Sequence, residues 1–476
     1  MLNSIDCNFL KRNVSSRLGP PGPCADEGSS MSEQERTPPP DGGMTRRAVV
    51  VGGGALAVGL VGGAAAGFGI GRATADEEVA ATAADTTTTG AQPAAVFAKA
   101  EGTTLKVFGT ELGTPWYDQS SQVTPHELFF VRNRYPSPRV DAATWKLEVK
   151  GDAIETPLTI SYEELRAMPS RAQPRVLECF GNGRTVNREQ LGHEVEGGNW
   201  GFSALSQGEW DYVPIKEILD RVKPTAEAEQ LLFWSGVDGP DTGRPIPMKD
   251  VLERPEEIGL AFGLNGLIPL PADHGGPVRA LVPGWGGAAS VKWLTEIRIS
   301  SHKFWTRMHT REEALIGADW EREEFDEAAD EFLGATKEDI QGQTATWQNT
   351  KSFLAFPYTY KNSEPPGRYV LDQGEVPKLP AGERTMRGYA NSPFGIEKVE
   401  YSVNGGETWQ EATLIEPTNL PFTRVRFEFP WNATAGSHVL ASRATDKQGN
   451  VQPETVALNK LGILCNAIAK FQVEVT

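Results

Sequence analysis

The chain has 476 residues, and 39% of them are hydrophobic, which is enough for a sizeable core and for two or more domains of ordinary size. Its formal net charge of -17 argues against nucleic acid or anionic lipid as the main partner and favours a basic protein partner. The four cysteines, Cys7, Cys24, Cys179 and Cys465, form no CxxC pair, so the sequence has no basis for a zinc site, a cysteine-held iron–sulfur cluster or a c-type haem.

The start of the chain predicts a leader and not a folded domain. Residues 1–43 are rich in Pro, Gly, Ser and charge, which predicts a disordered extension. Residues 44–75 contain Arg46 and Arg47, then an apolar Gly/Ala-rich run over 48–70 and an Ala-Thr-Ala end. This segment is similar to a twin-arginine export signal, with a Sec-type signal as the alternative. We therefore expect export to the periplasm or the outer face of the cytoplasmic membrane, with 48–70 as a membrane tether if it stays uncleaved.

An ordered domain is expected over 104–310, after an Ala/Thr-rich stretch at 76–103 that predicts a flexible linker. Apolar runs, alternation and helix-start signals mark the elements of this domain. They predict strands over 128–134, 145–149 and 231–238, and helices over 161–165 and 213–219. Ser161 and Glu164 form a capping box at the start of the first helix. The mixture predicts a domain of mixed α/β type.

One cysteine lies in the most distinctive stretch, 178–184, which reads Glu-Cys-Phe-Gly-Asn-Gly-Arg. Its two glycines allow sharp turns and close approach of a ligand, so Cys179 is expected at an open loop. A thiolate suits a thiophilic metal, and the planar guanidinium of Arg184 suits an oxyanion. Together they indicate a metal centre that handles a small anion. An ordinary buried thiol is the alternative, and from these residues alone it is the expected one.

Positive side chains gather again between residues 273 and 294. His274, Arg279 and Lys292 stand among Gly- and Pro-defined turns, which suits a phosphorylated ligand rich in heteroatoms. The stretch matches no P-loop or dinucleotide pattern, so it is weak as a plain phosphate loop.

Residues 311–365 are expected to form an acidic insertion and linker. Within them, 312–339 is dense in Asp and Glu, and Trp320, Phe325 and Phe332 recur at helix-like spacing. A solvated helix face is the first expectation. A docking patch for a basic electron carrier is the sharper alternative.

Residues 366–476 have the short alternating strands and turns of an all-β domain. Val425, Phe427 and Phe429 alternate with polar residues, and Asn404-Gly405-Gly406 predicts a hairpin turn. This spacing predicts an antiparallel β-sandwich.

Several of these stretches resemble one family. The cysteine stretch resembles the Cys-Ala-Gly-Asn signature of the sulfite oxidase family, with Phe180 in place of the alanine. Residues 130–134 resemble its Val-Arg-Asn-His segment, and 274–294 resemble its His-Gly-x-Pro-Val-Arg and Val-Lys-Trp-Leu elements. Residues 366–476 resemble its immunoglobulin-like dimerisation domain. The resemblance implies an α+β chain, with a molybdopterin-binding domain followed by an immunoglobulin-like sandwich.

The resemblance also implies the site residues. Cys179 would ligate molybdenum, and Arg132, Arg184 and Trp210 would be catalytic groups beside the substrate. The expected contacts with molybdopterin are Phe130, Val131, Arg132, Asn133, Arg134, Cys179, Asp238, His274, Arg279, Ser290, Val291 and Lys292. Without the resemblance, Arg132 reads as a solvated charge at a strand end and Trp210 as a core residue.

Three positions depart from the family pattern. Arg134 stands where the family has histidine, and Thr310 aligns with a tyrosine that assists at the metal. Leu461 stands where sulfite-oxidising members place an arginine in the anion pocket. A charge-assisted hydrogen bond is worth roughly 1.5–3 kcal/mol, so losing that arginine should weaken an oxyanion substrate by about tenfold or more. The cofactor prediction is unaffected, whereas the sulfite prediction is weakened.

Three functions follow as hypotheses. The first is an exported molybdenum-cofactor oxidoreductase that oxidises sulfite or a related small sulfur compound, as a homodimer that passes electrons to an external carrier such as a c-type cytochrome. The second is a reductase of sulfoxides, N-oxides or oxidised protein side chains on the same scaffold. The third is a non-catalytic exported binding protein, and the retained Cys179 with its pterin contacts argues against it.

Overall fold

The computed structural model describes residues 105–108, 111–114, 121–134, 136–236, 243–355, 361–363, 368–370, 376–416 and 419–476. All of them belong to one compact unit, Thr86–Thr476. The predictions for 1–43, 44–75 and 76–103, and the predicted site residue Asp238, lie outside the described residues. In the part of the chain that is described, no helix has the length and apolar character needed to cross a bilayer.

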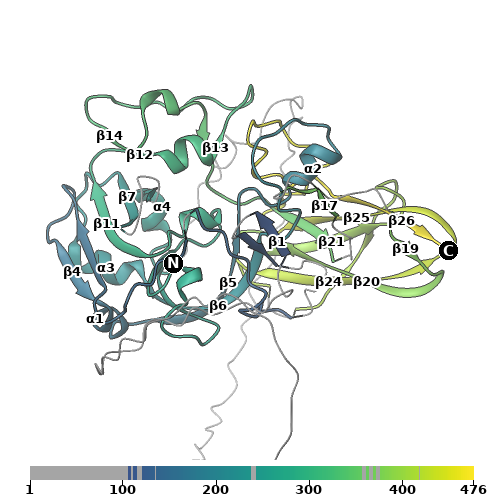
Figure 1. Ribbon diagram of the computed structural model, residues 1–476, viewed down its shortest axis with the longest axis horizontal. Helices are drawn as coiled ribbons and strands as arrows, with labels where there is room; N and C mark the ends of the chain where they lie inside the picture. Colours follow the sequence, from purple (N-terminus) through teal and green to yellow (C-terminus); the bar gives the residue numbers. More distant parts are fainter. Residues whose placement is uncertain are drawn as a thin grey trace, which may run out of the picture. The chain divides into compact units, whose positions relative to one another are not determined.

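A five-stranded sheet in the order β4-β3-β11-β7-β8 forms the first layer of the N-terminal region (Figure 1). Its strands are β3 (Lys146–Lys150), β4 (Leu158–Ser161), β7 (Gln230–Ser235), β8 (Gly243–Pro247) and β11 (Leu294–Ser300). β11 runs parallel to β3, and the other neighbours are antiparallel. Buried residues of the sheet share one core with α1 (Tyr162–Arg166), α3 (Ile215–Val222) and α4 (Met248–Glu253).

Four of the predicted elements of this region are confirmed. β3 and β7 are the strands expected over 145–149 and 231–238, and α1 and α3 are the two expected helices. The capping box is formed on both sides, because Ser161 Oγ accepts the Glu164 amide and the Glu164 carboxylate accepts the Ser161 amide.

A second, antiparallel sheet in the order β10-β9-β6-β5 carries the motif residues. Its strands are β5 (Arg171–Glu178), β6 (Leu205–Pro214), β9 (Gly259–Leu264) and β10 (Arg279–Leu281). Short helices hold further motif residues, namely α2 (Arg184–Glu189), the 3-10 helix η2 (Ala272–His274) and the 3-10 helix η3 (Gly287–Ala289). Since β5 ends at Glu178, this sheet delivers Cys179 at a strand end.

The strand predicted over 128–134 is wrong. Val131 makes only an isolated bridge with Leu112. The Phe129 amide donates to the Pro125 carbonyl in a turn, and the Phe130 amide donates to Ser206 Oγ at 3.0 Å. These turn and side-chain bonds take the backbone groups that a strand ladder would need.

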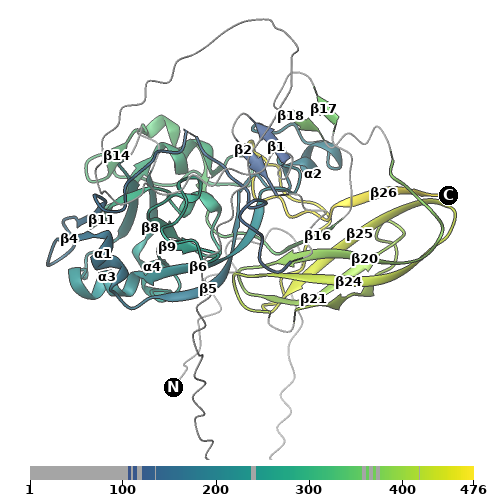
Figure 2. The same cartoon turned by 60° about the horizontal axis from the view of Figure 1, so that its bottom comes forward.

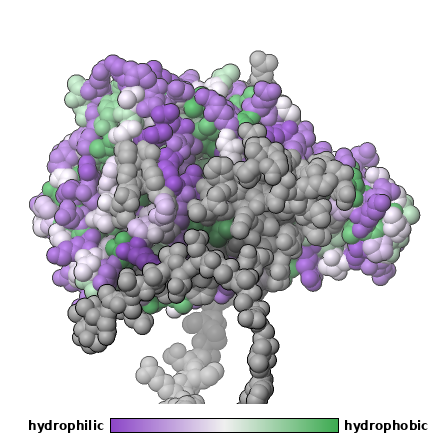
Figure 3. Space-filling view, in the orientation of Figure 1, coloured by the Kyte–Doolittle hydropathy of each residue, from purple (hydrophilic) through white to green (hydrophobic). Residues whose placement is uncertain are grey.

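Residues 304–344 form small sheets and turns, and the helix predicted over 312–339 is wrong. The elements are β12 (Phe304–Thr306), the π-helix η4 (Met308–Glu312), β13 (Ala314–Leu315), β14 (Glu331–Leu333), the 3-10 helix η5 (Lys337–Asp339) and β15 (Gln343–Thr344). Phe325 and Phe332 pack on buried Trp305. The Asp326 carboxylate accepts the amides of Ala328 and Ala329, and such local bonds compete with helix formation. Hydrophilic side chains cover much of this region on the face shown in Figure 3.

Two sheets enclose one core in the C-terminal region (Figure 2). The first holds β16 (Lys351–Leu354), β20 (Gly382–Asn391), β24 (Arg424–Ala433) and β23 (Thr413–Leu414). The second holds β19 (Lys378–Leu379), β26 (Lys470–Val475), β25 (Gly436–Asp446), β21 (Ile396–Ser402) and β22 (Gln410–Glu411). The remaining strands are β1 (Leu105–Phe108) with β2 (Glu111–Gly113), and β17 (Lys361–Ser363) with β18 (Arg368–Val370).

The predicted alternation holds in the C-terminal region. Val425, Phe427 and Phe429 are buried, and Gly405 and Gly406 make the turn after β21 with φ of 74° and 100°. The predicted boundary at residue 366 falls after β16, which already pairs with β20. We refer to β16 and residues 376–476 as the C-terminal domain.

Candidate active site

Cys179 opens a tight loop between the end of β5 and the start of α2. Its amide donates to the Ala204 carbonyl at 2.9 Å, and its carbonyl accepts the Asn182 amide at 3.0 Å. Gly183 closes the loop with a φ of 80°, a left-handed conformation that favours glycine. Phe180 and Asn182 are buried, whereas Cys179 is only half-buried. The loop therefore leaves Cys179 incompletely buried, and the alternative of a fully packed cysteine does not describe it.

Arg184 folds its guanidinium back over this loop. Its Nε donates to the Leu461 carbonyl at 2.7 Å, and its Nη1 donates to the Gly198 carbonyl. A Cβ at Gly181 would lie 2.8 Å from Nη1, so the glycine leaves room for the guanidinium. Burial lowers the pKa of Arg184 to about 10. Leu461, which replaces the family's arginine, thus still supports the site through its backbone.

Arg132 is exposed and lies close enough to act on the thiol. Burial raises the pKa of Cys179, and the positive charges of Arg132 and Arg184 oppose that rise. The two arginines that the sequence predicted as catalytic groups therefore both lie near Cys179.

Lys292 joins the segment of Arg132 to the second motif. Its Nζ donates to Asn133 Oδ1 and to the Asp273 carbonyl, both at 2.5 Å, and to the Arg132 carbonyl at 3.3 Å. Asn133 in turn donates to Ser137 Oγ at 2.8 Å, and Ser137 donates to the Asp273 carboxylate. The structure thus brings together Asn133 and Lys292, which the sequence separates by 159 positions.

Arg279 is the centre of a buried group that includes His274 and Ser290. Its guanidinium donates to the His274 carbonyl at 3.0 Å and to the Ser290 carbonyl at 2.5 Å. It also stands 5.3 Å from the ring centre of Trp210, which is fully buried. Trp210 therefore has the core position that was its alternative interpretation. Phe130, Val131 and Val291 are buried as well.

Two carboxylates that the sequence assigned to the acidic insertion lie near the site. Glu312 pairs with Arg134, the residue at the family's histidine position. Glu313 Oε2 accepts from Nη1 of the fully buried Arg244 at 3.1 Å, and its charge acts on the Cys179 thiol. Sequence reasoning missed Glu313 and Arg244. The available signal was an arginine inside the strand-like run Gly-Arg-Pro-Ile-Pro.

The residues aligned with the family's tyrosine are engaged locally. Thr310 Oγ1 donates to the Thr306 carbonyl at 3.1 Å, and His309 Nδ1 lies 2.9 Å from Thr306 Oγ1. Both side chains are buried, and His309 stacks on Trp305. Their polar groups therefore support η4 and β12.

Burial raises the pKa of Glu313 to about 7; Arg244, Arg132 and Arg134 oppose the rise and Glu312 adds to it. From about pH 4.5 to about pH 7, the folded chain holds a proton that the unfolded chain has lost, so this group's contribution to stability falls as the pH rises. We expect Glu313→Gln to remove this pH-dependent loss, which amounts to at most about 3 kcal/mol in the free energy of unfolding. The measurement is Tm at intervals from about pH 5 to about pH 8.

The matched control is Glu312→Gln, which removes a neighbouring carboxylate that is partly exposed. It should change the slope of Tm against pH less than Glu313→Gln does, because Glu313 itself remains and Glu312 adds only part of the rise in its pKa. Equal slopes in Glu313→Gln and the unmodified chain would contradict the prediction.

Known proteins are similar to this chain in sequence and in fold. The family described as "Oxidoreductase molybdopterin binding domain" matches residues 134–308, and "Mo-co oxidoreductase dimerisation domain" matches 368–476. The mitochondrial sulfite oxidase of Mus musculus is 30% identical over 369 residues, which cover 74% of this chain and 62% of that protein. The chain belongs to the sulfite oxidase family.

Two further proteins show how wide the similarity is. A nitrate reductase [NADH] of Ulva prolifera is 28% identical over 364 residues, which cover 71% of this chain and 39% of that protein. The sulfane dehydrogenase SoxCD of Paracoccus pantotrophus has the same fold, with a TM-score of 0.62 and 23% identity over 79% of this chain and 87% of that one. The chain spans about 62% of the length of the mammalian sulfite oxidases it matches.

The oxidoreductase molybdopterin-binding domain lies within this chain, so the cofactor is molybdenum held by molybdopterin. The residues present fit that group. Arg279 is 3% exposed, and burial alone lowers its pKa to about 9, with no carboxylate of the described residues contributing. A buried guanidinium without a carboxylate suits an anionic ligand such as the phosphate of a pterin cofactor. The half-buried Cys179 thiol suits the metal.

Proposed function

We propose that this chain oxidises sulfite or a related small sulfur compound, with water as the oxygen source, and passes the electrons to an external carrier. The observation that carries the proposal is that the positive charges of Arg132 and Arg184 both act on the Cys179 thiol, in a site that fits the molybdenum cofactor. The sulfite oxidases among the relatives support a sulfur compound as substrate.

The chain's own residues divide the work of binding and proton transfer. When bound, the cofactor supplies a two-electron couple linked to oxygen-atom transfer. Cys179 and the Arg279 group would hold it, and exposed Arg132 would bind the substrate's oxyanion with its planar donor fork. Oxidation of sulfite by water releases two protons and two electrons. The Glu313 carboxylate, with its pKa near 7, is suited to accept a proton beside the thiol.

A reductase of sulfoxides, N-oxides or oxidised protein side chains is the second candidate. Leu461 and Thr310 replace polar groups of sulfite-oxidising relatives, and Glu313 adds a negative charge near Cys179. These three features disfavour an anion and favour a neutral substrate. The third hypothesis, a non-catalytic binding protein, does not explain why the residues of the site fit the cofactor.

Metal analysis with a dye-linked assay tests the proposal. The purified protein should hold one molybdenum per chain and should reduce an artificial electron acceptor when sulfite is added. Turnover of a neutral sulfoxide with a reduced dye, without sulfite oxidation, would replace the oxidase proposal with the reductase. If the protein is purified from a host that makes the cofactor and still contains no molybdenum, both the oxidase and the reductase proposals are contradicted.

We also propose a homodimer built on an immunoglobulin-like C-terminal domain, with a c-type cytochrome as electron carrier. The match of 368–476 to a dimerisation domain and the two packed sheets support the dimer. The net charge of -17 suits a basic carrier. The exposed carboxylates around β14 are one candidate surface for it.

Export in the folded state by the twin-arginine route is a further part of the proposal. Replacing both Arg46 and Arg47 by lysine should keep the protein in the cytoplasm, because the route depends on the arginine pair. Cell fractionation with molybdenum analysis of each fraction is the measurement. Replacement of Arg72 by lysine is the control and should not block export. Unchanged export of the double variant would point to another route.

A further inference from the structure

Glu178, the residue before Cys179, is a fully buried carboxylate held by three side-chain donors. Its Oε1 accepts from Lys351 Nζ at 2.9 Å and from Asn182 Nδ2 at 2.8 Å, and its Oε2 accepts from Asn391 Nδ2 at 3.1 Å. Its backbone carbonyl accepts from Gln348 Nε2 at 2.9 Å. Both members of the Lys351–Glu178 ion pair have side chains with no exposed surface.

The donors couple the cysteine loop to the C-terminal domain. Lys351 on β16 and Asn391 on β20 are direct cross-strand partners, so one strand pair directs a cation and an amide at a single carboxylate. Asn182 lies in the cysteine loop itself, and its Oδ1 accepts the Ala204 amide at 3.1 Å. The residue next to the metal ligand is therefore held from both sides.

Stability alone is a poor explanation for this pair. Removing two charges from water largely offsets their attraction, so apolar residues of similar volume are often as stabilising. Taking away one partner, in contrast, leaves an uncompensated buried charge. An ion pair of this kind is better explained by the geometry that it imposes. Here it fixes the position of Glu178, which directly precedes Cys179 in the chain.

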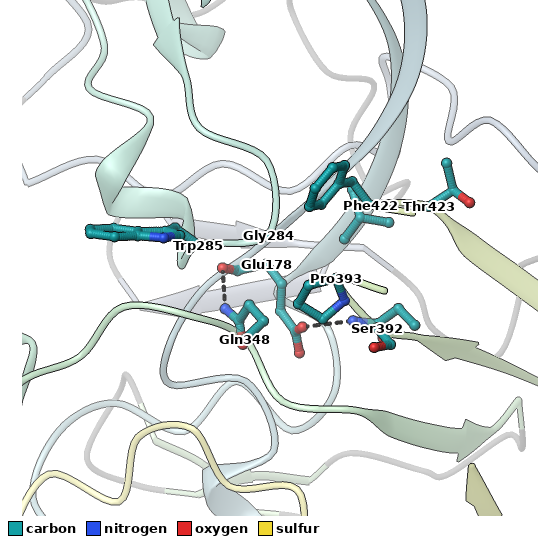
Figure 4. Close-up of a pocket in the computed structure, with 10 residues that line it drawn as sticks. Glu178, Gly284, Trp285, Gln348, Ser392, Pro393, Phe422 and Thr423 are labelled. Carbon is teal, nitrogen blue, oxygen red and sulfur yellow. Dashed lines mark hydrogen bonds between the residues drawn. The ribbon is translucent and has the colours of Figure 1, made fainter. Parts of the chain in front are cut away.

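A small cavity adjoins the same carboxylate (Figure 4). Its volume is about 20 Å³, which is enough for one water molecule. Trp285 Nε1, Gln348 Oε1 and Asn391 Oδ1 belong to residues that line it, and these buried atoms have no hydrogen-bond partner among the described residues. One donor and two acceptors are the partners that a bridging water needs, so the cavity can extend the network between the two regions.

We propose that Glu178 is a positioning residue for Cys179. Lys351 and Asn391 of the C-terminal domain hold its carboxylate, and through it this domain sets the position of the thiol relative to the cofactor. The inference rests on the assignment of Cys179 as the metal ligand. The C-terminal domain is then part of the scaffold of the metal site.

The test compares Lys351→Met with the compensated variant Lys351→Met/Glu178→Gln in the full-length holoprotein. The single variant should alter the electron paramagnetic resonance spectrum of the partly reduced metal and lower kcat per molybdenum roughly 10- to 100-fold, with little change in KM. The double variant should recover most of both, because glutamine keeps acceptor and donor groups without the buried charge. Lys398→Met, which removes a partly exposed ion pair with Glu400 in the same domain, is the control and should match the unmodified protein.

Asn391→Ala covers the case in which Lys351→Met yields no folded protein. It keeps the ion pair and should lower kcat per molybdenum roughly fivefold, with a changed spectrum. A folded variant with a lower Tm but an unchanged spectrum and unchanged kcat per molybdenum would overturn the inference, since the network would then be only structural. Unmodified protein without molybdenum would instead overturn the assignment of the metal ligand.

Discussion

Cys179→Ser should abolish turnover and leave the chain folded. A serine hydroxyl is a poor ligand for a thiophilic metal. Loss of a group that only supports a metal ligand lowers metal affinity or activity by about 10- to 100-fold. Loss of the ligand itself should therefore lower turnover by more than about a hundredfold. The fold should survive because the side chain is half-buried and the loop is held by backbone bonds to Ala204 and Asn182. The measurements are dye-linked turnover, molybdenum per chain and Tm.

Cys465→Ser is the matched control, since this cysteine is the other described thiol and belongs to the core of the C-terminal domain. Cys465 is 2% exposed, so the buried hydroxyl of the serine should lower the free energy of unfolding by about 1–3 kcal/mol, and Tm with it. The kcat per molybdenum should stay unchanged. If Cys179→Ser instead kept full activity, Cys179 would be a packing residue and the site would lie elsewhere.

The parts of the fold that the sequence predicts are those with local signals. Ser161 and Glu164 are three residues apart, so one short stretch reports a capping box. The alternation of Val425, Phe427 and Phe429 likewise reports a half-buried strand without reference to its partners. Lys292 was found as part of a positive cluster and Asn133 through resemblance, and their contact at 2.5 Å depends on the folded chain.

The failures are places where distant contacts override a local pattern. Phe325 and Phe332 have helix-like spacing, yet they pack on Trp305 from an irregular stretch and from β14. The run at 128–134 is apolar enough for a strand, but Ser206 and Pro125 take its backbone groups. The Glu178–Lys351 pair spans 173 positions, and no local pattern reports such a contact.

The network around Glu313 shows the same limit in the chemistry of the site. In the sequence, Glu313 is one acid among many in an acidic stretch. Only the folded chain puts it against Arg244 and near Cys179, which turns a surface charge into a largely buried group with a raised pKa. Composition therefore predicted a solvated segment, whereas its first two acids belong to the site.

Arg132→Gln should lower both kcat and kcat/KM for sulfite, by about 100- to 1,000-fold. Arg132 is exposed beside the thiol, and a fixed charge aimed at the developing transition state contributes to the chemical step. Arg184→Gln should raise KM more than it lowers kcat, because a buried cation that already donates to backbone carbonyls acts mainly on ground-state binding. It should also lower Tm, since those carbonyls lose charged donors.

Steady-state kinetics of the two variants at several salt concentrations, with sulfite and with a neutral sulfoxide, separate the two candidate functions. For an anionic substrate, added salt should weaken binding to exposed Arg132 in the unmodified protein and have little effect once Arg132 is gone. The control is Arg139→Gln, which removes another exposed arginine of the same stretch of chain. The contrary result is that the neutral sulfoxide is turned over well, at the same rate in both arginine variants as in the unmodified protein. In that case the anion-oxidase proposal fails and the reductase takes its place. Leu461, Thr310 and Glu313 would then belong to a pocket for an uncharged oxygen donor.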